Sequence, residues 1–110
     1  MSAGGDVLDL RTCQLKPGAA EAFGRIFEQE ALPLLTRLGI DVVAHGRSLE
    51  DADAQYLIRS FASLAERNER LDAFYGSDEW RKHRADVLAL IDSYHVVLLP
   101  AAPVRDALIG

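Results

Sequence analysis

The hydrophobic pattern of this sequence alternates between strand-like and helix-like segments, and the order of these segments limits the fold. Residues 7–15 are rich in β-compatible side chains and stop just before Pro17, which indicates a turn and a helix start. Apolar residues then recur every three or four positions up to Gly39, which is typical of an amphipathic helix that ends at a glycine. Pro33 lies within this helix and is expected to bend it near Gln29, whose carbonyl group loses its donor.

The second half of the chain repeats the alternation. Residues 40–48 and 55–61 are strand-like, and the acidic loop between them suits a hairpin. Ser63 and Glu66 have the spacing of a capping box, which predicts the start of a second helical segment. Residues 94–99 return to strand-like sequence. The order strand-helix-strand-strand-helix-strand predicts an α+β, ferredoxin-like βαββαβ fold, with a four-stranded antiparallel sheet and helices on one face.

Length and composition indicate a single domain. The chain has 110 residues, of which 49% are hydrophobic and 26% charged, the balance of an ordinary globular protein. We expect residues 1–6 to form a flexible N-terminal tail, residues 7–100 the folded domain and residues 101–110 a C-terminal tail. A chain this short has little burial to spare, so further burial against a partner subunit would add stability.

The last predicted strand is apolar on both of its faces. Tyr94, Val96 and Leu98 alternate along it with Val97 and Leu99. An antiparallel sheet with helices on one face and water on the other is expected to carry polar residues at alternate positions. Two helices cover only one face of such a sheet. We therefore predict a homodimer in which the sheets of two copies pack face to face.

Composition argues against several classes of partner. The net charge is −5, and the twelve Lys and Arg residues are spread along the chain without the basic stripe that nucleic-acid backbones require. Apolar runs such as residues 96–99 are far too short to span a membrane, and the N-terminus lacks the pattern of a signal peptide. The single cysteine, Cys13, fits a reducing compartment. We expect a cytoplasmic protein with no nucleic-acid partner and no membrane span.

Three stretches of the sequence resemble the NIPSNAP family. Residues 8–18 read LDLRTCQLKPG and are similar to the family's opening E-L-R-T-Y-x-L-K-P-G. Residues 63–67 resemble its S-L-x-x-R helix start, and residues 74–80 resemble its F-x-x-D-x-x-W segment. Asp9 and Cys13 depart from the glutamate and the tyrosine that the family carries at these places.

The resemblance implies the dimeric α+β barrel fold, in which two four-stranded sheets face each other. This agrees with the strand pattern. The wider superfamily includes cofactor-free monooxygenases, small isomerases and dehydratases, and haem-degrading proteins. The NIPSNAP group itself has no agreed reaction, so the resemblance implies a fold and leaves the chemistry open.

Five residues are candidates for ligand binding, and each also has a structural interpretation. The planar guanidinium of Arg11 could hold a carboxylate or an enolate, or could pair with an acidic side chain across the sheet. Arg59 has the same two interpretations, with an ion pair favoured. His45 could act as a base near neutral pH, although its polar neighbours favour an exposed histidine. Trp80 could line an apolar pocket or fill the core, and Tyr94 could donate to a bound carbonyl or lie at a subunit contact.

No metal ion, nucleotide or other cofactor is predicted. The three histidines lie on separate elements without metal-ligand spacing, and the sequence has no glycine-rich phosphate loop. Two functions remain. In the first, the chain binds a small hydrophobic, oxygenated molecule, either as a binding protein or as a metal- and cofactor-free enzyme of monooxygenase or isomerase type. In the second, it is a non-catalytic dimeric interaction or scaffold module. The two hypotheses differ in whether Arg11 and Arg59 reach an open pocket or are tied to carboxylates.

Overall fold

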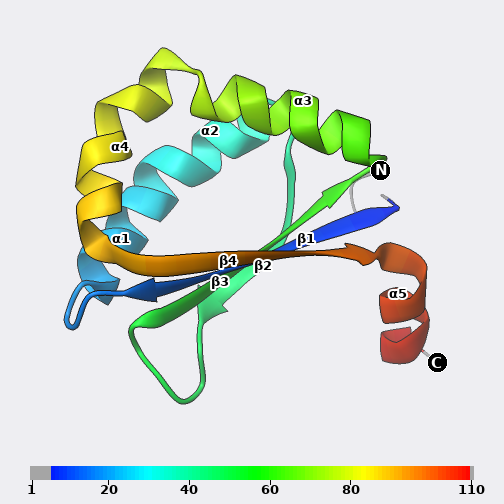
Figure 1. Ribbon diagram of the computed structural model, residues 1–110, viewed down its shortest axis with the longest axis horizontal. Helices are drawn as coiled ribbons and strands as arrows, with labels where there is room; N and C mark the ends of the chain where they lie inside the picture. Colours follow the sequence, from blue (N-terminus) through cyan, green and yellow to red (C-terminus); the bar gives the residue numbers. More distant parts are fainter. Residues whose placement is uncertain (1–5, 110) are drawn as a thin grey trace.

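The chain folds into an antiparallel sheet that carries helices on one face (Figure 1). The computed structural model describes residues 6–109. Within these residues the sheet has four strands in the order β2-β3-β1-β4, and all neighbouring strands are antiparallel. The strands are β1 (Val7–Leu15), β2 (Asp41–Arg47), β3 (Ala54–Phe61) and β4 (Ile91–Pro100). The predicted α+β, ferredoxin-like fold is therefore confirmed.

The first crossover is helical but contains one wide turn. Pro33 has no amide hydrogen to offer the carbonyl group of Gln29. The backbone responds with a π-helical turn, in which the Leu32 amide donates to the carbonyl oxygen of Phe27. Gly39, with a φ of +76°, ends the helical segment as predicted. The pieces of this crossover are α1 (Ala20–Ile26), η2 (Phe27–Ala31) and α2 (Leu32–Arg37).

Polar side chains fix the helix starts of the second crossover. Ser63 Oγ accepts a hydrogen bond of 3.0 Å from the Glu66 amide, and the Glu66 carboxylate accepts one of 2.6 Å from the Ala62 amide. Ser77 Oγ accepts one of 3.1 Å from the Trp80 amide and so fixes the first turn of the next helix. These bonds satisfy amides that have no partner inside the helix. The two helices are α3 (Leu64–Tyr75) and α4 (Asp78–Leu90).

Two apolar clusters lie at opposite ends of the space between the sheet and the helices. One cluster packs on Phe61 at the end of β3, and the other packs on Leu15 at the end of β1. Each large apolar side chain buried in this way contributes about 1.5–3 kcal/mol. The middle of β1 lies between the clusters. The larger cluster contains Ala31, Leu34, Leu35, Ile40, Phe61, Leu71 and Phe74, and the smaller one contains Cys13, Leu15, Ala19 and Ala20.

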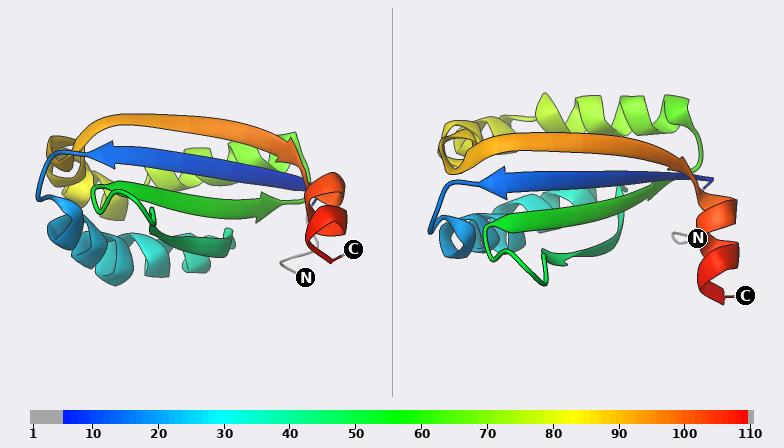
Figure 2. Two further views of the ribbon diagram at one scale, coloured as in Figure 1. Left: turned by 90° about the horizontal axis from the view of Figure 1, so that it is seen from below. Right: turned by 60° about the horizontal axis from the view of Figure 1, so that its bottom comes forward.

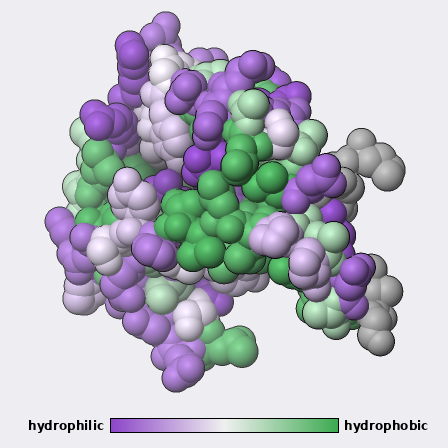
Figure 3. Space-filling model, turned by 45° about the vertical axis from the view of Figure 1, so that its right-hand side comes forward, coloured by the Kyte–Doolittle hydropathy of each residue, from purple (hydrophilic) through white to green (hydrophobic). Residues whose placement is uncertain are grey.

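The face of the sheet opposite the helices is uncovered (Figure 2). The strand register places Leu10 beside Ile58 on one side and Val97 on the other. Figure 3 shows a continuous patch of apolar surface across the middle of the side in view, where β4 runs. On this edge strand, Tyr94, Val97 and Leu98 are 39–60% exposed. The described chain thus presents an apolar strand edge and an apolar sheet face to its surroundings.

The C-terminal segment is helical where the sequence predicts a tail. Helix α5 (Ala101–Ile109) follows β4 directly, and the Ala101 amide donates a hydrogen bond of 2.9 Å to the Asp6 carbonyl oxygen. Pro103 lies in the first turn of α5, where a missing amide hydrogen costs no intrahelical bond, so it does not prevent the helix. Of the predicted N-terminal tail, residues 1–5 lie outside the described residues.

Candidate functional site

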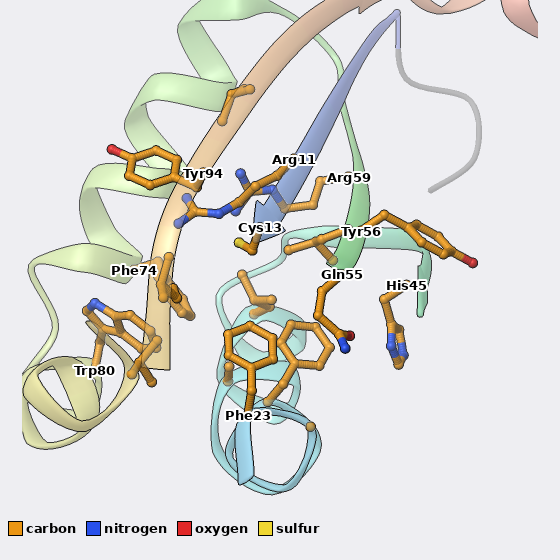
Figure 4. Close-up of a pocket in the computed structure, with 18 of the residues that line it drawn as sticks. Arg11, Cys13, Phe23, His45, Gln55, Tyr56, Arg59, Phe74, Trp80 and Tyr94 are labelled. Carbon is orange, nitrogen blue, oxygen red and sulfur yellow. The ribbon is translucent and has the colours of Figure 1, made fainter. Parts of the chain in front are cut away.

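A cavity of about 660 Å³ lies between the sheet and the helices, over the middle of β1. We call it the interlayer cavity. Figure 4 shows Arg11 and Cys13 projecting from β1 toward its centre, with Phe74 and Trp80 on one side and His45 on the other. Seven of its lining residues are aromatic, and its volume is within the range of small-molecule sites. The helices and the sheet therefore border a space large enough for a ligand.

Arg11 is a cation on the floor of this cavity whose contacts are all with neutral groups. Its Nη1 donates a hydrogen bond of 3.0 Å to the phenolic oxygen of Tyr75. Its guanidinium carbon lies 4.4 Å from the centre of the Tyr94 ring, a cation–π distance. Among residues 6–109, no carboxylate lies within 4.0 Å of this guanidinium. An acid pair for Arg11, one of the two interpretations of the sequence, is thus absent from the described part of the chain.

The charge of Arg11 is stable. Burial acts to lower the pKa of its guanidinium, but Tyr75, the Cys13 thiol and Tyr94 act in the opposite direction and together raise that pKa above its usual value. Arg11 is therefore a permanent cation at any pH at which the protein is folded. If the affinity for a bound anion changes with pH, the change comes from protonation of the anion.

Arg59 lies on the same face of the sheet but is closed by an ion pair. It is 2% exposed, and its Nη2 lies 3.0 Å from Oδ1 of Asp9, which is fully buried. The second oxygen of Asp9 accepts a bond of 2.9 Å from Nε of Arg67 on α3. One carboxylate thus holds two guanidinium groups and joins β1, β3 and α3. Nε of Arg59 is buried without a hydrogen-bond partner and borders the cavity.

The other three candidate residues also line the interlayer cavity. Trp80 packs on Phe74, with 4.9 Å between the ring centroids. Tyr94 is 60% exposed and lies at the rim. His45 is exposed, as its neighbours indicated, and its ring lies 4.9 Å from that of Phe27. The structure therefore brings all five candidates to the border of one cavity, although Arg59 is already paired.

Gln55 is a lining residue that sequence reasoning missed. It faces Cys13 in the register of β1 and β3, and its Nε2 is buried without a hydrogen-bond partner. The sequence did carry a signal, because Gln55 alternates with Leu57 and Arg59 and so shares their face of the strand. A polar side chain in that position needs a partner, and no residue among 6–109 supplies one to this nitrogen.

Two other kinds of feature are missing from residues 6–109. No group of three or more histidine, cysteine, aspartate or glutamate side chains is placed so that it could hold a metal ion. None of the helices described is long and apolar enough to cross a membrane.

The family model described as NIPSNAP matches residues 8–104 of the chain. The chain belongs to the NIPSNAP family. The match begins on β1 and continues into α5, so it covers the whole sheet and every element that lines the cavity. No curated protein matches this NIPSNAP chain.

Solved structures of other NIPSNAP proteins share this fold. An uncharacterized NIPSNAP domain protein from Burkholderia xenovorans superposes with a TM-score of 0.79 at 15% identity, over 87% of this chain and 95% of that one. A NIPSNAP protein of unknown function from Agrobacterium tumefaciens gives a TM-score of 0.79 at 23% identity, over 87% of each chain. A protein from Nitrosomonas europaea, provisionally named an antibiotic biosynthesis monooxygenase, gives 0.67 at 13% identity, over 84% of this chain and 95% of that one. These likenesses establish the fold of this NIPSNAP domain.

Proposed function

We propose that this NIPSNAP domain binds a small hydrophobic, oxygenated molecule in the interlayer cavity. The observation that carries the proposal is the combination of about 660 Å³ of space with a cation, Arg11, that has no carboxylate partner among the described residues. A cleft of this size, lined by apolar side chains and a few polar groups, is the usual form of a small-molecule site. A ligand would cover the apolar walls and supply the oxygen acceptors that the donors on the floor need.

The same arrangement suits catalysis without a metal ion or a bound cofactor. Arg11 is placed to stabilise an oxyanion or enolate that develops on a bound molecule, because its guanidinium holds a positive charge and hydrogen-bond donors on the cavity floor. His45 and Arg11 lie in one row across the sheet, with Leu57 between them. Two strand spacings put their backbones about 10 Å apart. A ligand that spans this distance would meet a cation at one end and a base at the other, which fits monooxygenase- or isomerase-type chemistry.

The test of binding is a thermal-shift screen of aromatic acids, quinones and polyketide-like carbonyl compounds, with a cavity-filling variant beside the wild type. Gly24 lines the cavity, and a Cβ built there meets no atom within 4 Å, so the side chain of Gly24→Leu starts in open space at the cavity border. Ala73→Leu, on the exposed side of α3, adds the same bulk elsewhere. A ligand at about a hundred times its dissociation constant stabilises the native state by roughly 2.7 kcal/mol. The shift should vanish in Gly24→Leu and persist in Ala73→Leu, and equal shifts in both variants would contradict the proposal.

We also propose that the uncovered sheet face pairs with a second copy of the chain. Leu10, Ile58 and Val97 adjoin one another on this face, and no helix of the described chain covers them (Figure 2). Covering such a face removes apolar area from water at roughly 25 cal/mol per Å². Light scattering should give twice the 12.1 kDa mass of one chain, and Ile58→Lys should give the single mass. A wild-type mass of 12.1 kDa at micromolar concentration would refute the homodimer.

The buried free thiol of Cys13 is compatible with a cytoplasmic location.

A further inference from the structure

We propose that the ligand of the interlayer cavity is a hydrophobic monoanion whose carboxylate binds the guanidinium of Arg11 and the phenol of Tyr75. This inference rests on the proposed function and names the class of molecule that the cavity takes. It is supported by the charge of the lining, by the free hydrogen-bond donors on the floor, and by the shape of the walls.

The residues that line the cavity carry a net positive charge, whereas the whole chain is negatively charged. The chain as a whole carries −5, yet five of its twelve cationic side chains border the cavity, against a single glutamate. Asp9 offsets one of these charges through its ion pairs, which leaves an excess of three positive charges. Cations gathered around a low-dielectric space raise the local concentration of anions. The charged residues on the border are Arg11, Arg47, Arg59, Arg67, Arg84 and Glu28.

Arg11 has the donors that a carboxylate needs. A guanidinium carries five N–H donors in one plane, and one donor of Arg11, on Nη1, goes to the Tyr75 oxygen. The remaining donors are free to form the paired bonds that guanidinium makes with a carboxylate. The Tyr75 oxygen accepts from Arg11, so its own hydrogen is free to donate to the same anion. Arg11 and Tyr75 together therefore present donors to one acceptor group.

The other unpaired groups around the cavity are donors as well. Nε2 of Gln55 and Nε of Arg59 are both buried without a partner. Gln55 lies diagonally across the strand pair from Arg11, because its register partner is Cys13. A second oxygen on the ligand, such as a keto or hydroxyl group, would satisfy Gln55.

The walls select a flat or slender apolar body. The rings of Phe23 and Phe27 are nearly parallel, at 10° with centroids 6.4 Å apart, and they form one side. Phe74 and Trp80 form the other, in tilted contact. An aromatic ring or an alkyl chain fits between such surfaces. The molecule therefore has an acid at the end that lies on Arg11 and an apolar remainder among the four aromatic rings.

The experiment compares acids with their own neutral amides, so that shape is held constant while charge changes. The probes are 2-naphthoate and dodecanoate, each beside its primary amide, with binding measured by calorimetry at fixed salt. The bonds of one charged group predict that the wild type binds at least one acid about tenfold to a hundredfold more tightly than its amide. Arg11→Gln should abolish that preference. Arg81→Gln, which removes an exposed arginine of α4 outside the cavity border, should keep it.

Each outcome decides between the hypotheses. Equal affinity for acid and amide, or a preference that survives in Arg11→Gln, would overturn the anionic ligand while leaving the binding cavity in place. No binding of any probe, with Gly24→Leu indistinguishable from the wild type in the wider ligand screen, would overturn both proposals. Circular dichroism and thermal unfolding of Arg11→Gln establish that the variant is folded. Arg11→Lys keeps the charge without the planar fork and should fall between the wild type and Arg11→Gln.

Discussion

Asp9 and Arg11 lie two residues apart on the same face of β1, yet they belong to opposite kinds of environment. Around Asp9 the charged groups pair with one another, because its two oxygens hold Arg59 and Arg67 at 3.0 and 2.9 Å. Around Arg11 the partners are a phenol, a thiol and an aromatic ring. We call the surroundings of Asp9 the closed end of this row of residues and the surroundings of Arg11 the open end. The same residue type, arginine, therefore fastens elements together at one end and leaves unused donors at the other.

The difference follows from what each end must do. At the closed end a buried carboxylate joins two strands and a helix, and its loss would leave buried cations without a counter-charge. At the open end the counter-charge is missing from the described chain, and a cavity lies where it would be. A cation that has a place for its partner but no partner indicates a binding function, whereas a satisfied pair indicates a structural one.

The largest expected effect is at the closed end. Asp9→Asn keeps the shape of the side chain but removes the charge shared by Arg59 and Arg67. Breaking a buried ion pair on one side costs about 3–5 kcal/mol. The free energy of unfolding from urea titration at pH 7 should fall by this amount. A loss below about 1 kcal/mol would mean that the closed end is not held by charge.

The matching change at the open end should separate binding from stability. Arg11→Gln removes a cation that has no carboxylate partner, so the free energy of unfolding should stay within about 1 kcal/mol of the wild type. Its affinity for a hydrophobic acid should nevertheless fall about tenfold to a hundredfold. The same urea titration and the calorimetric comparison measure the two quantities. If Arg11→Gln were as unstable as Asp9→Asn, the contrast between the two ends would be lost.

Filling the cavity should trade binding for stability. Gly24→Leu replaces a helical glycine by a strong helix former, which stabilises α1 by up to about 1 kcal/mol. The added side chain also restores contacts inside the cavity. We expect a higher melting temperature together with loss of ligand binding. A lower melting temperature would mean that the space around Gly24 is already occupied.

The smallest effect is a pH dependence at the N-terminal cap of α3. The hydrogen bond from the Ala62 amide, together with Arg70, lowers the pKa of Glu66 below its usual value of 4.5, although burial opposes this. Because the pKa is lower in the folded state, Glu66 stabilises the protein above about pH 4.5, and this contribution is lost as the pH falls through the lowered value. Glu66→Gln should therefore show a shallower acid-side decline in melting temperature. An unchanged profile would contradict the role of this cap.

The sequence predicts the elements well where local chemistry sets them. β1 ends at Leu15 because Pro17-Gly18 turns the chain, and the helix starts at Ser63 and Ser77 follow from their caps. β4 begins at Ile91, three residues before the predicted Tyr94. This start is hidden in the sequence, because Ile91 continues the helical spacing of α4 and no loop separates the helix from the strand. Helix α5 lies where the sequence predicts a C-terminal tail, because the two prolines near its start end strand pairing without preventing a helix.

The site was only partly predictable, because its contacts depend on strand register. The partner of Arg59 is Asp9, fifty positions away, and only the pairing of β1 with β3 brings them together. A register shift between Val42 and Ala44 also breaks the expected alternation of β2, so that Asp41 lies opposite Ser60 while His45 lies opposite Leu57. No local pattern reveals such a shift, and one residue of error reverses every face.

A crystal structure of the protein with 2-naphthoate would show whether Arg11 binds the acid group of the ligand. We expect the naphthalene ring among the aromatic side chains of the interlayer cavity. Its carboxylate oxygens should lie within about 3.2 Å of the Arg11 guanidinium and the Tyr75 hydroxyl. An acid that binds on the uncovered sheet face, or that enters the cavity with its carboxylate directed away from Arg11, would contradict this expectation.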